Sequence, residues 1–192
     1  MTAQINDKLR FDKSDFDIVA IENTENFFDF EKIGLKPIAN CTACWRGYIA
    51  IFGIDEDNNL VLKDLYSNND DMEPPLINGV EVFEINDWQE NLYTLAGNLV
   101  YKDINLPIPY TGSFLIGDNF IDDLYVHMGF QHPFKYEYLE EFIFENGVCI
   151  ETRDLSKEAK ERREKEKSTD KVTKSPVQWI EDQFDLGYRK KW

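Results

Sequence analysis

The sequence contains few cysteines and no long apolar run. Three cysteines in 192 residues are an odd number, which fits a reducing compartment better than a disulfide framework. No segment reaches the roughly 18 apolar residues that a membrane-spanning helix needs. The first residues also lack the apolar region of a secretory signal. We therefore expect a cytoplasmic protein with no membrane association.

Basic residues are scarce before residue 154. Residues 1–153 carry 10 Lys/Arg against 28 Asp/Glu, a net charge of −18, whereas residues 154–192 carry 11 against 9, a net charge of +2. The acidic region 1–153 repels phosphate backbones and anionic lipids, which disfavours direct binding to nucleic acid or membrane. It attracts a basic protein partner. The alternative is that the acidic surface serves solubility alone.

The sequence also has no serine elbow, no acidic dyad and no glycine-rich phosphate loop, and it has only two histidines. If 123–128 is a strand, Tyr125 and His127 share one of its faces. There a neutral imidazole can act as a general base, with Arg46 beside it. A structural histidine is the competing interpretation. We predict no catalytic residue, and His127, Arg46 and Tyr125 form the alternative set.

Metal-binding patterns are incomplete. Cys41 and Cys44 have the spacing of half a zinc site, but a second pair of ligands is missing. The segment 55–59 resembles part of a calcium loop, yet it lacks the glycine and the distal glutamate of that motif. We expect packed thiols, with no metal and no cofactor.

Aromatic and other apolar residues are plentiful and form strand-like segments. The runs 44–54 and 60–65 flank a polar turn and predict a β-hairpin whose first strand is central, with Trp45 or Phe52 buried. Further strands are predicted at 16–21, 80–85, 95–101, 111–116, 123–128, 138–144 and 148–152. Residues 1–15 are expected to be frayed or edge-like, and 23–31 to be a short helix or an aromatic-rich connection. The fold class predicted is mainly β (α+β), an antiparallel sheet forming a sandwich or partly closed barrel, with C-terminal helices.

Three regions follow from composition: an acidic β-rich domain at 1–153, a charged helical linker at 154–174, and a short docking helix with a tail at 175–192. The linker offers almost no apolar face to bury. In the last region Trp179, Ile180 and Phe184 lie on or near one side of a capped helix. That helix docks either on its own sheet or on a partner.

Two short motifs carry a resemblance. The chain reads Ala43-Cys-Trp-Arg-Gly-Tyr48 and later Tyr125-Val-His-Met-Gly-Phe130, followed by an acidic hairpin containing Glu145-Asn-Gly147. Together they resemble small, uncharacterised acidic proteins of bacteria or phages. The resemblance implies no catalytic activity. Such proteins include immunity proteins that cap basic toxins and antagonists that mimic nucleic acid.

These observations favour a non-enzymatic acidic binding or inhibitor protein that engages a basic protein partner. Its expected partner-binding residues are carboxylates in three groups: Asp55, Glu56 and Asp57; Asp70, Asp71 and Glu73; Asp122 and Asp123. The alternative is a small enzyme or small-molecule-binding domain with a pocket around Arg46, Tyr48, Tyr125 and His127. The sequence identifies neither the partner nor the oligomeric state.

Overall fold

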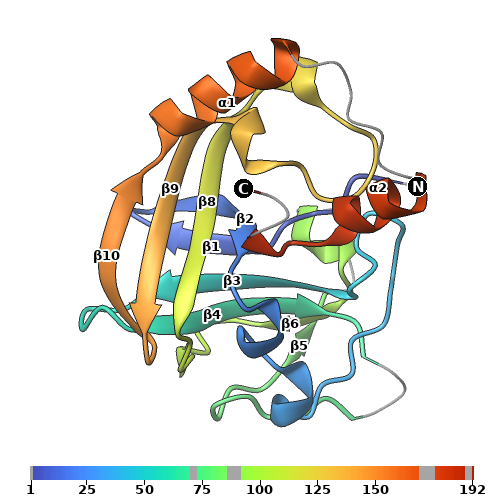
Figure 1. Cartoon of the computed structure of the whole chain (residues 1–192). Helices are drawn as coiled ribbons and strands as arrows, with labels where there is room; N and C mark the ends of the chain where they lie inside the picture. The colour runs from blue at the N-terminus through green and yellow to red at the C-terminus, as the bar shows by residue number, and fades with distance from the viewer. Residues whose placement is uncertain (1, 70–72, 86–91, 169–175, 189–191) are drawn as a thin grey trace.

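The chain folds around one large mixed sheet (Figure 1). The computed structural model describes residues 2–69, 73–85, 92–168, 176–188 and 192. The strands are β1 (Lys8–Phe11), β2 (Ser14–Ile21), β3 (Tyr48–Ile54), β4 (Leu60–Ser67), β5 (Phe83–Glu84), β6 (Leu99–Tyr101), β7 (Leu106–Pro107), β8 (Gly112–Phe120), β9 (Tyr136–Glu145) and β10 (Val148–Asp154). The helices are α1 (Ser156–Ser168) and α2 (Pro176–Phe184), with short 3-10 helices between strands.

The strand order is β10-β9-β8-β2-β1-β3-β4-β6-β5, with β7 paired to β4. All of these pairs are antiparallel except β1 with β3. The mainly β class, the largely antiparallel pairing and the C-terminal helices are confirmed. Within the described ranges the sheet stays open and does not close into a barrel. The β3–β4 turn and the β9–β10 turn nevertheless contact each other. The Leu60 N–H donates to the Gly147 carbonyl over 2.7 Å, and the Cys149 N–H donates to the Asn58 carbonyl over 2.8 Å.

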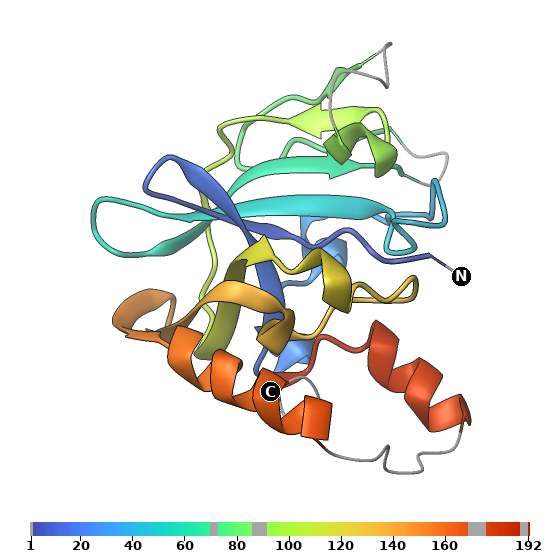
Figure 2. The same cartoon turned by 90° about the horizontal axis from the view of Figure 1, so that it is seen from above.

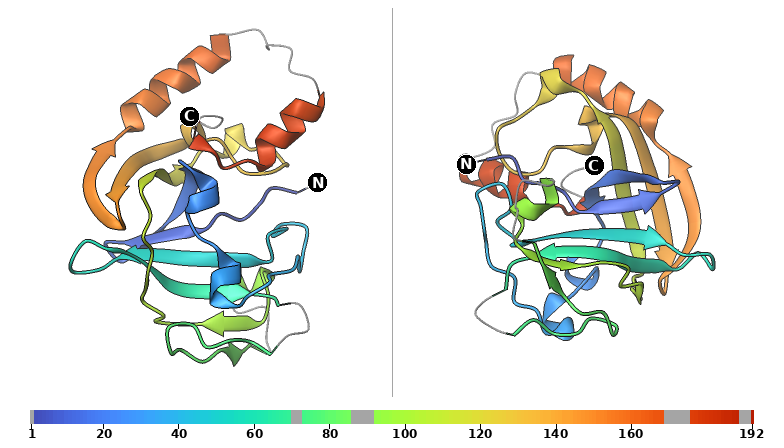
Figure 3. Two further views of the ribbon diagram at one scale, coloured as in Figure 1. Left: turned by 60° about the horizontal axis from the view of Figure 1, so that its bottom comes forward. Right: turned by 180° about the vertical axis from the view of Figure 1, so that it is seen from behind.

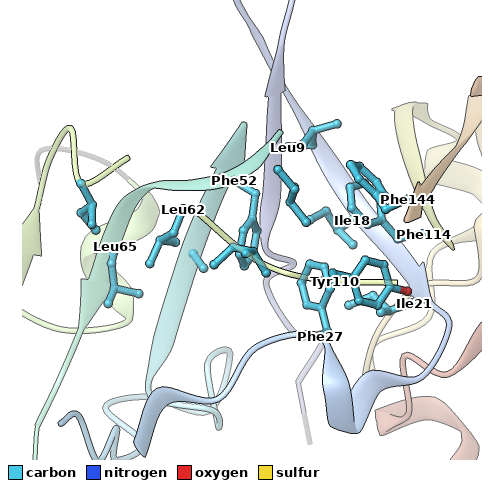
Figure 4. Close-up of a cluster of buried hydrophobic side chains, with 14 of the residues drawn as sticks. Leu9, Ile18, Ile21, Phe27, Phe52, Leu62, Leu65, Tyr110, Phe114 and Phe144 are labelled. Carbon is cyan, nitrogen blue, oxygen red and sulfur yellow. The ribbon is translucent and has the colours of Figure 1, made fainter. Parts of the chain in front are cut away.

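The sheet bends sharply, so that β8, β9 and β10 run steeply across the direction of β3 and β4 (Figures 1 and 3). The main core fills the inside of this bend (Figure 4). Leu9, Ile18 and Phe114 are fully buried in it, and Phe52 is 1% exposed. The prediction of a central β3 with a buried Phe52 is therefore confirmed, while Trp45, just before the strand, is 48% exposed.

The expectation that residues 1–15 are frayed or edge-like is wrong. β1 lies inside the sheet between β2 and β3 and pairs in parallel with β3, with Lys8 opposite Ile51. The polar composition of β1 led to the wrong prediction, because its charged side chains form ion pairs with residues of β2 and β4. Lys8 forms an ion pair with Asp17, and the Arg10 guanidinium bonds Asp15 at 2.7 Å and the buried Asp64 at 3.0 Å.

The strand expected at 123–128 does not form. Instead, the 3-10 helix Asp122–Leu124 leads into a loop that the side chain of Gln131 holds together. The Gln131 Oε1 atom accepts a hydrogen bond from the Val126 N–H at 3.1 Å, and its Nε2 donates to the Val126 carbonyl at 2.6 Å. A side-chain amide therefore replaces the strand partner that this backbone would otherwise need. The segment 23–31, predicted to be a short helix or an aromatic-rich connection, contains the short 3-10 helix Thr24–Asn26 and the start of a second one, Phe30–Ile33, with Phe27 and Phe28 between them.

The two C-terminal helices pack on the chain itself (Figure 2). Despite its charge, α1 buries Ala159 completely and lies against β9. One Arg163 Nη1 atom donates to the carbonyls of Phe134 and Tyr136, both at 2.7 Å. These contacts, together with the neighbouring Leu155 in the same apolar cluster, seat a helix that was expected to have no buried face. None of the described helices has the length and apolar character needed to cross a membrane.

The docking helix packs in cis. The Phe130 N–H donates to the Gln183 carbonyl of α2 over 2.7 Å, and the Ile21 N–H donates to the carbonyl of Leu186 over 2.8 Å. Residues 169–175 of the predicted linker lie outside the described part of the chain.

Candidate functional site

A cavity of about 730 Å³ opens beside the main core. It lies between the segment before β1, the 3-10 helices after β2, the start of β3, the loop around Phe130, and α2. Eight aromatic side chains line it: Phe27, Phe28, Phe30, Trp45, Tyr48, Phe52, Phe130 and Phe184. Figure 4 shows two of them, Phe27 and Phe52, within the core cluster, where their ring centroids are 4.9 Å apart.

One buried ion pair forms part of the polar wall. The Arg46 Nη1 atom lies 2.5 Å from Asp7 Oδ2, and Nη2 donates to the Ile5 carbonyl at 3.0 Å. The other Asp7 oxygen accepts the Ala50 N–H of β3 at 2.9 Å, which fixes the carboxylate to the sheet. The Asp7 side chain is 5% exposed and the Arg46 side chain 20% exposed. Burial disfavours the Arg46 charge, but Asp7 outweighs that effect and raises the pKa of the guanidinium.

Two aromatic rings complete the surroundings of Arg46. Its Cζ atom lies 4.7 Å from the centroid of the Tyr48 ring and 5.1 Å from that of Phe130. Burial raises the pKa of Tyr48 to about 12, so its hydroxyl stays neutral at physiological pH. The guanidinium is therefore held by one carboxylate, one carbonyl and two π faces.

The sequence dictates the turn that presents these residues. The Gly47 N–H donates to the Cys44 carbonyl at 3.2 Å, closing a turn with Trp45 and Arg46 at its centre. Gly47 has a φ of +71°, and a Cβ there would lie 2.2 Å from the Ile38 carbonyl oxygen. Only glycine fits this position without strain. Trp45 and Arg46 consequently project from the turn while Tyr48 begins β3.

The C-terminal segment supplies the opposite wall. Gly129 has a φ of +62°, and a Cβ added there would lie 2.3 Å from the Gln183 carbonyl oxygen, so this glycine lets α2 approach the loop. The ring of Phe184 then stacks on that of Trp45, with centroids 4.8 Å apart and planes 6° apart. Glu181 and Asp185 line the same side of the cavity, and Glu181 is exposed to solvent.

Among the lining residues that the structure describes, carboxylates outnumber basic groups. Asp7, Glu181 and Asp185 carry three formal negative charges against the positive charge of Arg46, which leaves −2 for this part of the lining. Aromatic faces attract cations through their quadrupoles. The arrangement is therefore suited to a group that is both flat or apolar and positively charged.

The structure brings together only half of the pocket predicted in the alternative. Arg46 and Tyr48 both line the cavity, but Tyr125 and His127 do not. Tyr125 is 50% exposed, and its hydroxyl lies 3.1 Å from the Nδ1 atom of His127 on the outer loop. From the same motif it is Gly129 and Phe130 that contribute to the site.

The predicted partner-binding carboxylates are dispersed. Asp55, Glu56 and Asp57 form the turn between β3 and β4, whereas Glu73 follows β4, at the other end of the same hairpin. At about 3.4 Å per residue, an eight-residue strand separates these ends by roughly 25 Å. Asp122 and Asp123 lie in a 3-10 helix after β8, where Asp123 borders a second cavity together with Lys157 and Lys160 of α1. Asp70 and Asp71 lie outside the described residues.

Cys41 and Cys44 form a tight turn, with the Cys44 N–H donating to the Cys41 carbonyl at 3.2 Å. Both are free thiols, and burial raises the pKa of Cys44 to about 11. The Cys44 Sγ atom contacts the Tyr48 carbonyl at 3.2 Å, so this thiol supports the turn before β3. Across the described ranges, no cluster of three or more His, Cys, Asp or Glu side chains has the geometry to hold a metal ion.

Several cavity residues were not predicted. Phe27, Phe28 and Phe30 could have been identified from the sequence, because aromatic residues concentrate in that connection. Asp7 could not, since its role depends on the parallel pairing of β1 with β3. The docking-helix prediction identified Phe184, whose ring lines the cavity; Ile180 is half-buried, and the side chain of Trp179 lies outside the described part of the chain.

Comparisons with protein-family models, with curated protein sequences and with solved structures found no match to this chain.

Proposed function

We propose that this protein is a non-enzymatic binding protein that engages a basic protein partner through the aromatic cavity at Arg46. The carrying observation is the combination of eight aromatic side chains with an excess of carboxylates in one cavity. A volume of about 730 Å³ falls within the range of roughly 300–1,000 Å³ typical of ligand sites. It accommodates a side chain together with part of the backbone that carries it.

The energetics of such a site favour a central anchor. A side chain that enters a largely apolar, desolvated pocket contributes more to affinity than contacts at the periphery. Trp45 is the ring best placed to receive it, since it lines the cavity while 48% of it stays exposed. The anchor would thus gain contact area without displacing the core residues Phe27 and Phe52.

Charge supports a basic partner. The net charge of −18 on residues 1–153 accelerates encounter with a cationic surface and disfavours nucleic acid. A cytoplasmic inhibitor of a basic protein, of the immunity or nucleic-acid-mimic type, is the role that this chemistry supports. Dispersed carboxylates such as Asp55 and Asp123 contribute to long-range attraction under this proposal, whereas the cavity carries the specific contact.

An enzymatic role has less support. It required Tyr125 and His127 to join Arg46 and Tyr48 in one concave site, and the first two lie on an outer loop. The Arg46 guanidinium is already bound by Asp7, Ile5 and two rings. This arrangement favours a structural part of a binding wall over a residue that acts on a substrate.

Fluorescence anisotropy with labelled Gly/Ser-rich peptides tests the proposal. Peptides containing basic residues should bind and peptides containing acidic residues should not. Trp45→Ala should weaken binding by at least about tenfold, which corresponds to 1.4 kcal/mol. Phe83→Ala is the matched control, because Phe83 is also 48% exposed but lies in β5, outside the cavity. Equal affinities of the Trp45→Ala and Phe83→Ala variants, or no binding of any basic peptide, would contradict the proposal.

A further inference from the structure

We infer that the cavity is an arginine-binding site: the group it takes from the partner is the guanidinium of an arginine side chain. This inference rests on the proposed function and specifies the chemistry of the ligand. Three features of the cavity support it: the way it already holds one guanidinium, the parallel rings on the opposite wall, and the position of the carboxylates.

The first feature is the environment of Arg46. The cavity wall satisfies this guanidinium with the Asp7 carboxylate, at 2.5 Å, and with the faces of Tyr48 and Phe130. Aromatic faces combined with a carboxylate suit guanidinium, because the group is planar, delocalised and weakly hydrated. Since Asp7 neutralises Arg46, a second guanidinium entering the cavity meets a neutral pair instead of an isolated positive charge.

The second feature is the stack of Trp45 and Phe184. Their planes are only 6° apart and their centroids 4.8 Å apart, so the two rings form a face-to-face stack, here called the ledge, on the α2 side of the cavity, and its outer face can take a further planar group. Trp45 is half exposed and therefore presents ring surface to an incoming group. Tryptophan is the aromatic side chain that attracts cations most strongly, and arginine is the cation most often found over such rings.

The third feature is the pair of carboxylates beside that ledge. Glu181 belongs to the same helix as Phe184, and Asp185 follows Phe184 directly. The Asp185 Oδ1 atom accepts the Gly187 N–H at 2.6 Å, which holds this side chain against the end of the helix. A carboxylate oxygen accepts more than one hydrogen bond, so both groups can receive donors from a guanidinium stacked on the ledge.

Other ligand charges fit less well. An anion would face a charge of −2 on the described lining residues, and the Arg46 guanidinium among them is already paired with Asp7. A lysine ammonium is a compact, strongly hydrated charge that does not stack, and entering an aromatic pocket would strip its water. Arginine keeps a planar contact with the rings and still reaches the carboxylates.

Titration calorimetry with one Gly/Ser peptide in four forms tests the inference. The central residue is arginine, lysine, citrulline or glutamate. Citrulline is the decisive comparison, because it has nearly the same shape as arginine without the charge. We expect the arginine form to bind at least about tenfold more tightly than the citrulline form and several-fold more tightly than the lysine form. The glutamate form should not bind.

Variants locate the site. Glu181→Gln and Asp185→Asn should each weaken the arginine form several-fold, whereas Glu56→Gln, an exposed carboxylate on the β3–β4 turn, should not. Lysine equal to arginine, with binding still lost in Trp45→Ala, would overturn the arginine assignment and leave the proposed function standing. Citrulline equal to arginine would overturn both, because the proposed function requires a positively charged group. Absence of binding by every form would overturn both. Free ethylguanidinium that binds as tightly as the arginine peptide would identify a small organic cation as the ligand and overturn the assignment to a protein side chain.

Discussion

Trp45 and Phe184 stack with their ring centroids 4.8 Å apart and their planes nearly parallel, although they lie in the first quarter of the chain and close to its end. The contact makes the C-terminal helix part of the site that the turn before β3 begins. Hydrogen bonds from Phe130 and Ile21 to the same segment hold it in place. The cavity therefore depends on α2 staying docked.

Replacing Gly129 with alanine should loosen α2. Its new Cβ would lie 2.3 Å from the Gln183 carbonyl oxygen, so the Phe130–Gln183 hydrogen bond must lengthen or break. Gly79→Ala is the control, because Gly79 also has a positive φ, +80°, but a Cβ there meets nothing within 4 Å. Hydrogen exchange should show faster exchange of α2 amides and of the Phe130 amide in Gly129→Ala only. Equal protection of α2 in both variants would show that the glycine does not control docking.

Phe52→Ala should destabilise the domain by about 3–5 kcal/mol, because Phe52 is fully enclosed in the main core and its removal leaves a cavity. Phe83→Ala should change the free energy of unfolding by about 1 kcal/mol or less, since half of that side chain is already in water. Urea denaturation measures both. Similar losses for the two variants would contradict the assignment of β3 as a core strand.

Asp64→Asn should weaken the fold at neutral pH by about 3 kcal/mol, because it leaves a buried ion-pair site incomplete. Asp64 accepts from Arg10 at 3.0 Å, Lys102 at 3.1 Å and the Asp103 N–H at 3.1 Å. Burial opposes its ionisation, but these donors outweigh burial and lower the pKa of the carboxyl. Its contribution is therefore present above the ordinary aspartate pKa of about 4 and is lost as the pH falls through the lower folded value.

The test of Asp64 is urea unfolding of wild type and variant at pH 7 and again below pH 3. The difference in the free energy of unfolding between wild type and Asp64→Asn should be smaller in acid. Asp57→Asn, at an exposed turn carboxylate, should match wild type at both pH values. A difference that is the same at both pH values would mean that packing, and not charge, accounts for the lower stability of Asp64→Asn.

Stability should fall as the pH rises above about 10, and Tyr101 should contribute to the fall. Burial raises the pKa of Tyr101 to about 12. Between the ordinary tyrosine pKa of about 10 and this folded value, the unfolded chain releases a proton that the folded chain keeps. Each pH unit in this range therefore lowers the free energy of unfolding by at most about 1.4 kcal/mol. Below pH 10, Tyr101→Phe should be about 1 kcal/mol less stable than wild type, because the hydrogen bond from its hydroxyl to the Pro75 carbonyl, 2.9 Å long, is gone. Above pH 10 its stability should decline less steeply than that of wild type. Parallel declines would refute the assignment.

The sequence predicted the β-rich core well because it depends on local patterns. Alternating and continuous apolar runs identified β3, β4, β9 and β10 to within a few residues. It failed where a distant partner decides the structure. β1 carries charged residues that are typical of a surface strand, and its ion pairs with β2 and β4 allow these residues to lie inside the sheet.

The site residues that depend on local pattern were also predicted, and those that depend on a distant partner were not. Arg46 and Tyr48, two of the four residues of the predicted pocket, line the cavity, because both stand at the turn that begins the predicted strand β3. Trp45, which was predicted only as a possible buried core residue, lines the cavity as well. Tyr125 and His127 were misplaced, since the alternation argument assumed a strand that the Gln131 side chain replaces with a loop. Asp7 could not be predicted from local pattern, because its partner Arg46 reaches it only across the parallel β1–β3 pair.

Intermolecular NOEs between an arginine-containing peptide and the isotopically labelled full-length protein test whether an arginine side chain enters the cavity. We expect NOEs from the arginine side-chain methylene protons to the rings of Trp45 and Phe184, with upfield shifts of those methylenes from the ring currents. NOEs confined to the turn at Asp55 or to the α1 side at Asp123, with the Trp45 and Phe184 resonances unchanged, would contradict it.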